Sequence, residues 1–170
     1  KCLQLSNERM VPHASQMYVA LLHIKIEGLM TLFNTNKNIY ENVLNDYYGT
    51  LVRLIDLNGG DIIQFLNGDQ LVVMFQNNNK EQERETSKAA IILKAIHCAV
   101  TVKSQLKQYI VCLSRNQRLK VQLKMSISSG NIMNAYIGGQ NKRWNYLIDG
   151  PPLRQLIPLR KIVKGGHILL

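Results

Sequence analysis

The segment from Gly59 to Phe75, GGDIIQFLNGDQLVVMF, constrains the fold of this chain more than any other segment. Two apolar runs, Ile62–Leu66 and Leu71–Phe75, lie on either side of Asn67-Gly68. Asn-Gly readily adopts the two positive φ angles of a type I′ turn, because neither residue is strongly disfavoured there. The pattern therefore predicts two antiparallel strands joined by a tight turn.

Asp69 follows this turn directly, so we expect its carboxylate to lie at the hairpin tip, exposed and held by rigid strands. A carboxylate in that position is suited to bind a hard cation. An Asp beside Asn-Gly is also ordinary turn chemistry, which explains the residue without any ligand. On this segment alone both interpretations stay open.

Strand and helix patterns alternate along the rest of the chain. An apolar run predicts a strand over Met17–Ile26, and apolar residues at helical spacing predict a helix over Ile39–Leu57. A second helix, with an acidic first turn, is predicted over Lys80–Tyr109.

The C-terminal third is predicted to hold further strands, one turn and one helix. These are strands over Val121–Ile127 and Ile132–Ile137 with a turn at Ser128-Ser129-Gly130, a strand over Trp144–Ile148, a helix from Pro151 to about Val163, and a strand-like end at Ile168–Leu170. The element order predicts an α+β fold: a ferredoxin-like βαββαβ core with added C-terminal strands and a helix.

Length and composition indicate one domain, spanning residues 1–170. The chain is 46% hydrophobic, which is enough for a single globular core. Because it begins at Lys1, we expect a segment of a longer, multidomain polypeptide. The most apolar stretch, Ala89–Val102, contains Lys94 and His97, so no membrane span is predicted. Three scattered cysteines favour free thiols in a reducing cytosol and argue against zinc.

The net charge of +10 is concentrated in the last third of the chain. Residues 1–112 carry 11 basic and 10 acidic side chains, whereas residues 113–170 carry 10 basic and 1 acidic. Such an excess attracts an anionic partner, although each single residue is also explained as a solvated surface group. The ten basic residues of the candidate patch are Arg115, Arg118, Lys120, Lys124, Lys142, Arg143, Arg154, Arg160, Lys161 and Lys164.

Four ordered blocks carry a resemblance to a known family. They read ALLHIKIEGLMTLF, NVLNDYYGTLVRLIDLNGGDIIQFLNGDQLVVMF, LKMSISSGNIMNAYIGG and RWNYLIDGPPL. Together they resemble the catalytic domain of class III adenylyl and guanylyl cyclases, and most closely the soluble, bicarbonate-responsive adenylyl cyclase type. The similarity extends over nearly the whole chain. Each block alone would be weak, but their order and spacing make the match specific.

The resemblance implies a fold, a reaction and a partner. In that family the core is ferredoxin-like, and two such domains pair head to tail with nucleotide sites at their interface. The ribose 3′-oxygen of ATP attacks the α-phosphate and pyrophosphate is released. Two Mg²⁺ or Mn²⁺ ions, held by two aspartates, activate the nucleophile and neutralise the phosphates.

This chain departs from the family at the first metal-binding position. The residue matching the first metal aspartate is Lys25, whose ammonium group repels a metal ion. Glu27 is a weak substitute, because two residues along a strand span about 6 to 7 Å. The second metal aspartate matches Asp69, which is the one metal-ligand candidate left.

The resemblance also assigns nucleotide contacts. Lys25 and Glu27, with the backbone from Ile26 through Gly28 to Leu29, are the candidates near the phosphates, and Gln64 stands at the position of the base-recognising lysine. The family hairpin reads Lys-Phe-x-Gly-Asp, so this chain has one extra residue before Asp69, which we expect to re-aim the carboxylate.

The C-terminal block departs as well. Where the family has an asparagine and, four residues later, an arginine, this chain has Arg154 and Pro158. No catalytic residue is therefore assigned, and ATP and metal binding are expected to be weak or absent.

Three hypotheses from different functional classes follow. The first is a catalytically impaired cyclase homology domain used for dimerisation, regulation or scaffolding in a larger protein. The second is one half of an active adenylate cyclase that is completed by a better-equipped partner domain. The third is a basic nucleic-acid-binding module, which is disfavoured because the strands lack clustered aromatic residues. By analogy with soluble cyclases, we expect a cytoplasmic, or ciliary and axonemal, location and an acidic partner surface such as that of microtubules.

Overall fold

The computed structural model describes residues 13–77, 85–106, 109–114, 117–138 and 144–170. In chain order the elements are β1 (His13–Glu27), α1 (Leu29–Thr35), α2 (Lys37–Leu57), β2 (Asp61–Leu66), β3 (Gln70–Phe75), α3 (Glu85–Gln105), β4 (Tyr109–Ser114), β5 (Gln117–Gly138), β6 (Trp144–Asp149), α4 (Pro151–Ile162) and β7 (Ile168–Leu169).

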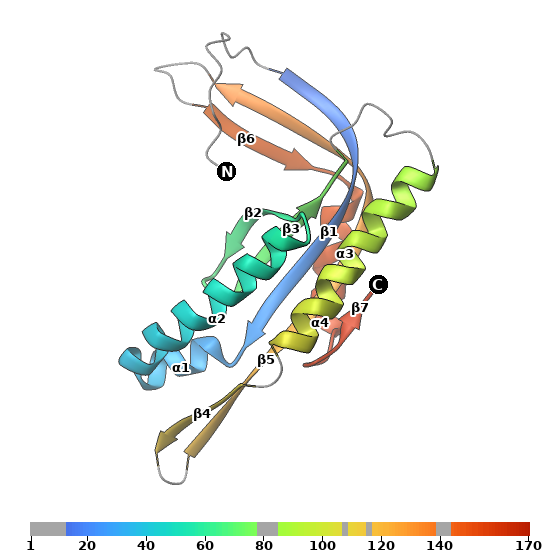
Figure 1. Ribbon diagram of the computed structural model, residues 1–170. Helices are drawn as coiled ribbons and strands as arrows, with labels where there is room; N and C mark the ends of the chain where they lie inside the picture. The colour runs from blue at the N-terminus through green and yellow to red at the C-terminus, as the bar shows by residue number, and fades with distance from the viewer. Residues whose placement is uncertain (1–12, 78–84, 107–108, 115–116, 139–143) are drawn as a thin grey trace.

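The strands form one sheet, and β1 and β5 run through its middle (Figure 1). The order is β2-β3-β1-β5-β4, and both β6 and β7 also pair with β5. All these pairs are antiparallel except β5 with β7. The order of β2, β3, β1 and β5, with α2 and α3 on one face, is that of a ferredoxin-like sheet. The predicted α+β fold with added C-terminal elements is confirmed.

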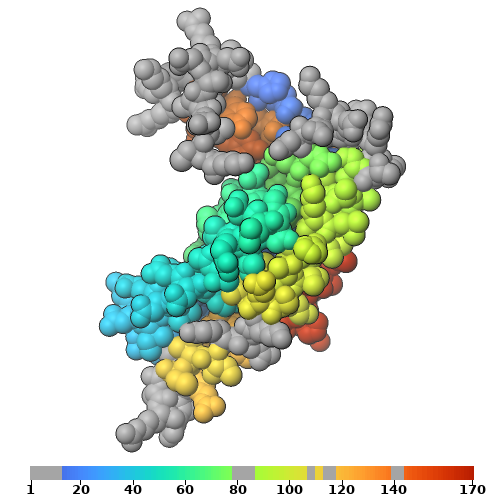
Figure 2. All heavy atoms as spheres, viewed as in Figure 1, coloured from blue at the N-terminus to red at the C-terminus, as the bar shows by residue number. Residues whose placement is uncertain are grey.

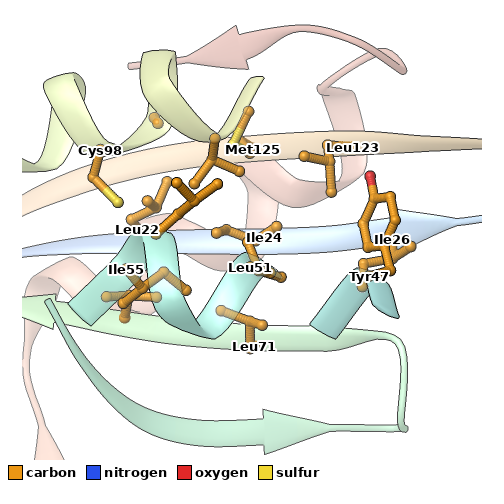
Figure 3. Packing of buried hydrophobic residues seen from close by; sticks show 14 of the residues in the cluster. Leu22, Ile24, Ile26, Tyr47, Leu51, Ile55, Leu71, Cys98, Leu123 and Met125 are labelled. Atoms are coloured by element: carbon orange, nitrogen blue, oxygen red, sulfur yellow. The ribbon is translucent and has the colours of Figure 1, made fainter. Parts of the chain in front are cut away.

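The main core lies between the sheet and helices α2 and α3. Alternate residues of β1, namely Leu22, Ile24 and Ile26, point into it and meet Leu51 and Ile55 of α2 (Figure 3). All five are at most 1% exposed. Complete burial of such a side chain stabilises the fold by about 1.5 to 3 kcal/mol. In Figure 2 the side chains of α2 and α3 lie side by side over the middle of this face.

Helix α4 covers part of the opposite face. There Leu156 of α4 packs in a smaller cluster with Val19 and Leu21 of β1. This cover is partial: toward the end of β1 that leads into α1, the same face carries His23, Lys25 and Glu27. The sheet face is therefore polar at this end.

The second predicted helix is shorter than expected. Helix α3 ends at Gln105, and β4 begins at Tyr109, where the prediction still had helix. The run Tyr109-Ile110-Val111 is aromatic and β-branched, so it fits a strand, and it pairs with the first residues of β5. Residues 80–84 and 107–108 of the predicted helix lie outside the described residues.

The turn predicted at Ser128-Ser129-Gly130 is wrong, because β5 runs through it without interruption. Gly130 pairs with Val19 of β1, and Ser129 with Ala20. The glycine has a packing role instead: a Cβ there would lie 3.0 Å from Cγ of Pro152. The Ser-Ser-Gly signal therefore marks the place where the start of α4 approaches β5.

The predicted β2–β3 hairpin is confirmed. Asn67 and Gly68 have φ angles of 53° and 74°, both positive as expected. The pair Leu66 and Gln70 closes the hairpin, so the loop has three residues and includes Asp69. Helix α1 was not predicted, because its seven residues are too few to show a helical period.

Candidate functional site

Polar side chains alternate with core residues near the end of β1. His23, Lys25 and Glu27 lie on the face opposite α2 and α3, because successive strand residues point to opposite faces. Lys25 pairs across the sheet with Gln70 of β3 on one side and with Lys124 of β5 on the other. The site is thus built on three neighbouring strands in the middle of the sheet.

Lys25 and Asp69 are brought together. The Lys25 Nζ lies 3.6 Å from Asp69 Oδ2, and the Asp69 carbonyl accepts a 2.8 Å hydrogen bond from the Ile26 N–H. Asp69 is 6% exposed, so the expectation of an exposed carboxylate at the hairpin tip is wrong. The backbone bond to β1 turns this loop residue inward, over the sheet face.

The two ladders of β3 differ in regularity. A bulge interrupts the ladder between Ile62 and Gln64 in the edge strand β2. The β1–β3 ladder, by contrast, runs without a break to Lys25 and Gln70. The bulge thus lies before Gln64, in the edge strand, and the hairpin is in regular register from Gln64 to Leu66.

A buried hydrogen-bond chain holds the other oxygen of Asp69. The Gln70 Nε2 donates to Asp69 Oδ1 at 3.2 Å, and Gln70 Oε1 lies 3.1 Å from His23 Nε2. Since Gln70 Oε1 can only accept, His23 carries its proton on Nε2. Burial lowers the pKa of His23, the bond to Gln70 opposes this, and the nearby Arg160 adds to the lowering. His23 is therefore neutral at pH 7.

Glu27 is engaged elsewhere. Its carboxylate lies 2.6 Å from Lys124 Nζ and accepts a 2.6 Å hydrogen bond from Gln122 Nε2. The bond from Lys124 is the main reason why the pKa of Glu27 is lowered. The Glu27 carboxylate is therefore charged, and it is paired with side chains of β5 and not with Asp69.

These residues do not fit a divalent metal ion. Mg²⁺ and Mn²⁺ need several oxygen ligands and a negative site. Here Asp69 faces the ammonium of Lys25 and the amide of Gln70, and Lys124 neutralises Glu27. Within the described ranges, no group of three His, Cys, Asp or Glu side chains could hold a metal ion.

The nucleotide-binding candidates are only partly gathered in space. The side chains of Ile26 and Leu29 are buried in the main core. Gly28 has a φ of 94°, and a Cβ there would lie 2.6 Å from the carbonyl oxygen of Lys120, so the turn into α1 requires glycine. Gln64 lies on edge strand β2, about 10 Å from β1, since β3 intervenes.

An apolar groove flanks the other side of the hairpin. It has a volume of about 610 Å³ and lies between α2 and β2. Tyr48 of α2 donates a 3.1 Å hydrogen bond to the Gly68 carbonyl, which fixes the hairpin loop to the helix. Burial raises the pKa of Tyr48 to about 12. The groove is lined by Tyr40, Leu44, Asn45, Tyr48, Gly49, Val52, Phe65 and Gly68.

The basic residues of the last third fall into separate groups. Arg118, Lys120 and Lys124 lie on β5, and Arg160, Lys161 and Lys164 lie at or just after the end of α4. Arg154 is apart from both groups at the start of α4, where it binds Asp149 at 2.9 Å and lowers the pKa of that carboxyl. Arg115, Lys142 and Arg143 lie outside the described residues.

Sequence reasoning missed the roles of His23, Gln70 and Lys124. A usable signal existed: the order His23-x-Lys25-x-Glu27 interrupts an apolar strand with polar residues at every second position. That period places all three side chains on one face. It does not reveal which strands lie beside them, and hence it does not reveal the partners.

The fold has clear structural neighbours. The adenylyl cyclase CyaB from P. aeruginosa superposes with a TM-score of 0.73 at 17% identity, over 92% of this chain and 78% of that one. The guanylate cyclase domain of RhGC from Catenaria anguillulae, in complex with GTP, gives 0.67 at 12% identity, over 91% and 79%. The non-canonical dimeric guanylyl cyclase domain of the RhoGC fusion protein from the aquatic fungus Blastocladiella emersonii gives a TM-score of 0.68 at 13% identity, over 94% of this chain and 82% of that one.

Comparisons of the sequence itself give no relative. No protein-family model matches the chain, and no curated protein matches it. At these low identities the structural likeness concerns the fold. The chain has the α+β fold of adenylyl and guanylyl cyclase catalytic domains.

Proposed function

We propose that this chain is a cyclase homology domain that does not catalyse cyclisation and serves as a dimerisation, regulatory or structural domain of a larger assembly. One observation carries the proposal: the Lys25 ammonium lies 3.6 Å from the Asp69 carboxylate, where the resemblance implies a second aspartate and a metal ion. The ammonium group of Lys25 thus takes the place of the metal ion that the resemblance implies beside Asp69.

The exchange of aspartate for lysine affects the chemistry in two ways. The resemblance implies that two carboxylates hold the ions that activate the nucleophile. Lys25 supplies no oxygen ligand, and its charge opposes a metal ion at Asp69. Glu27 does not compensate, since Lys124 and Gln122 already hold its carboxylate.

The direct test measures cyclic AMP and cyclic GMP formation from ATP and GTP, with Mg²⁺ and with Mn²⁺. We expect background product from the unaltered chain and from Asp69→Ala alike. Product that forms with the unaltered chain and disappears in Asp69→Ala would overturn the proposal. Circular dichroism of both proteins checks that each is folded.

Pairing with a second cyclase-fold domain, in the same or another chain, is part of this proposal. The β5–β6 ladder offers a surface for it, since Met133, Ile137 and Leu147 are 42%, 52% and 46% exposed and share one face of the sheet. Sedimentation equilibrium of the chain and of Leu147→Glu tests it. We expect a dimer that the glutamate dissociates, and a monomer in both would contradict self-pairing.

A second candidate is half of an active adenylate cyclase that binds ATP beside a better-equipped domain. Lys25 and Arg160, whose charges both act on His23 at the polar end of β1, favour it, because cations suit a polyphosphate. Isothermal titration with ATP, with and without Mg²⁺, decides this point. Absence of heat in both titrations would eliminate the candidate.

We further propose a cytoplasmic or ciliary location and an acidic partner such as the microtubule surface, supported by the basic last third of the chain. In the described part of the chain, no helix has the length and apolarity needed to cross a membrane. Co-pelleting with microtubules across a salt series tests the partner. Binding that ignores salt, or no binding at low salt, would count against it.

A further inference from the structure

Three basic side chains follow one face of β5. Arg118, Lys120 and Lys124 are separated by even numbers of residues, so they project from the same side of the strand. Alternate strand residues are about 6.6 to 6.8 Å apart, so Arg118 and Lys120 have that spacing. Lys124 lies two such steps from Lys120, with Gln122 between them. Arg118 and Lys120 are exposed, and Lys124 is half-buried. We call these three residues the β5 row.

The turn after α4 extends the row. The Gly166 N–H donates to the Leu123 carbonyl at 2.7 Å, and the Met125 N–H donates to the His167 carbonyl at 3.2 Å. These bonds bind the turn to β5, and they bring the exposed Lys164 to the same end of the sheet. The positive surface therefore combines residues that are about 40 positions apart in sequence.

Carboxylates at this end of the sheet do not balance the row. Glu27 pairs with Lys124 and Asp69 pairs with Lys25. Among the described residues, Arg118, Lys120 and Lys164 have no ion pair. An uncompensated group of cations attracts anions, and little backbone entropy is lost on binding because the strand is already ordered.

The surface also has an apolar margin. Ile110 and Cys112 of β4 pair with Lys120 and Arg118, so they share the same face, and Ile110 is 56% exposed. No aromatic side chain lies among these described residues, and aromatic side chains are what single-stranded nucleic acids stack on. The chemistry therefore favours a peptide over RNA.

We propose that Arg118 and Lys120 of the β5 row, with Lys164, bind an extended segment rich in Asp and Glu from a partner protein. Alternate side chains of an extended peptide repeat at nearly the spacing of Arg118 and Lys120, so two successive carboxylates of the segment meet these two cations. Ile110 meets an apolar residue of the segment. This inference rests on the acidic partner proposed above and not on the loss of cyclase chemistry.

Fluorescence anisotropy with a labelled oligoglutamate peptide tests the inference. The variant Arg118→Glu/Lys120→Glu reverses two charges of the row. The control Arg53→Glu/Lys94→Glu makes the same change in net charge on α2 and α3, which cover the opposite face of the sheet. Circular dichroism confirms that both variants are folded.

We expect the row variant to bind the peptide about tenfold or more weakly, since each substitution replaces an attraction between opposite charges with a repulsion. The control should change affinity by less than about twofold. Binding should weaken as salt is added. Equal losses in both variants would show a net-charge effect and overturn the inference.

The same titration with a homopolymeric RNA and with phosphatidylserine vesicles separates the alternatives. Tighter, row-dependent binding to either would replace the acidic peptide as the ligand class and refute the proposal. The cyclic nucleotide assay is independent of this outcome. Cyclase activity would overturn the proposed function without affecting oligoglutamate binding, and loss of oligoglutamate binding would leave the proposed function intact.

Discussion

The Lys25–Asp69 ion pair can be tested by a double-mutant cycle with Lys25→Met and Asp69→Asn. Two unit charges 3.6 Å apart attract by about 1 kcal/mol in bulk water and by about 5 kcal/mol at an effective dielectric constant of about 20. The Lys25 side chain is 37% exposed and that of Asp69 is 8% exposed. Screening and desolvation therefore reduce the net coupling, which we expect to be about 1 to 2 kcal/mol.

The two single variants should differ in a definite direction. Lys25→Met leaves a charged Asp69 without its cation in a buried place, whereas Asp69→Asn leaves a lysine that can turn toward solvent. We therefore expect the loss of unfolding free energy to be about 2 kcal/mol for Lys25→Met and about 1 kcal/mol for Asp69→Asn. Relief of the repulsion from Lys124, directly opposite on β5, lowers the first value by a few tenths.

Urea unfolding of the four proteins, at low and at high salt, gives the coupling energy. The exposed Arg154–Asp149 pair is the internal control, and a matched cycle there should show no measurable coupling. A coupling at Lys25 and Asp69 as small as that of the control would refute our account of the site. So would a greater loss from Asp69→Asn than from Lys25→Met.

Three further measurements test other parts of the structure. Burial lowers the pKa of His23, so the unfolded chain binds more protons below pH about 6.5; stability should fall as the pH drops from 7.5 to 5, and His23→Asn should flatten this slope in urea midpoints. Gly28→Ala should cost about 2 to 3 kcal/mol because of its φ of 94° and its contact with β5, whereas Gly49→Ala in α2 should stabilise by about 0.5 to 1 kcal/mol in thermal unfolding; equal effects would contradict this. Burial raises the pKa of Cys98 to about 11, so maleimide should label the exposed Cys112 and leave Cys98 unmodified in the native protein, as read by mass spectrometry.

Local patterns were sufficient to predict much of the fold. The β2–β3 hairpin followed from Asn67-Gly68, and the long helix α2 from its apolar spacing, because both signals arise within a few residues. The turn expected at Ser128–Gly130 failed for a physical reason. Gly130 has no side chain, which leaves room for Pro152 to pack against β5. Pro152 is distant in sequence, so a local pattern does not predict this contact.

The sequence indicated which residues form the site, but it did not indicate which of their side chains contact one another. The resemblance marked Lys25 and Asp69 as the decisive positions, and the structure places them together. The inward position of Asp69 depends on a backbone bond from Ile26, and its second partner, Gln70, comes from the adjoining strand. The engagement of Glu27 by Lys124 likewise required the register of β1 with β5.

The spatial arrangement of the basic residues was likewise not predictable from the sequence. The sequence located the basic excess in the last third but treated its ten residues as one group. The strand period and the turn after α4 separate a row on β5 from Arg154, which binds Asp149. Only the three-dimensional arrangement defines a surface that a partner could recognise.

Manganese binding tests the central claim most directly, with the electron paramagnetic resonance signal of free Mn²⁺ as the readout. Our account predicts that the unaltered chain leaves this signal unchanged, because Lys25 occupies the cation position beside Asp69. It predicts that Lys25→Asp, which places a second carboxylate near Asp69, depletes the free signal. Depletion by the unaltered chain that Asp69→Asn abolishes would contradict the account.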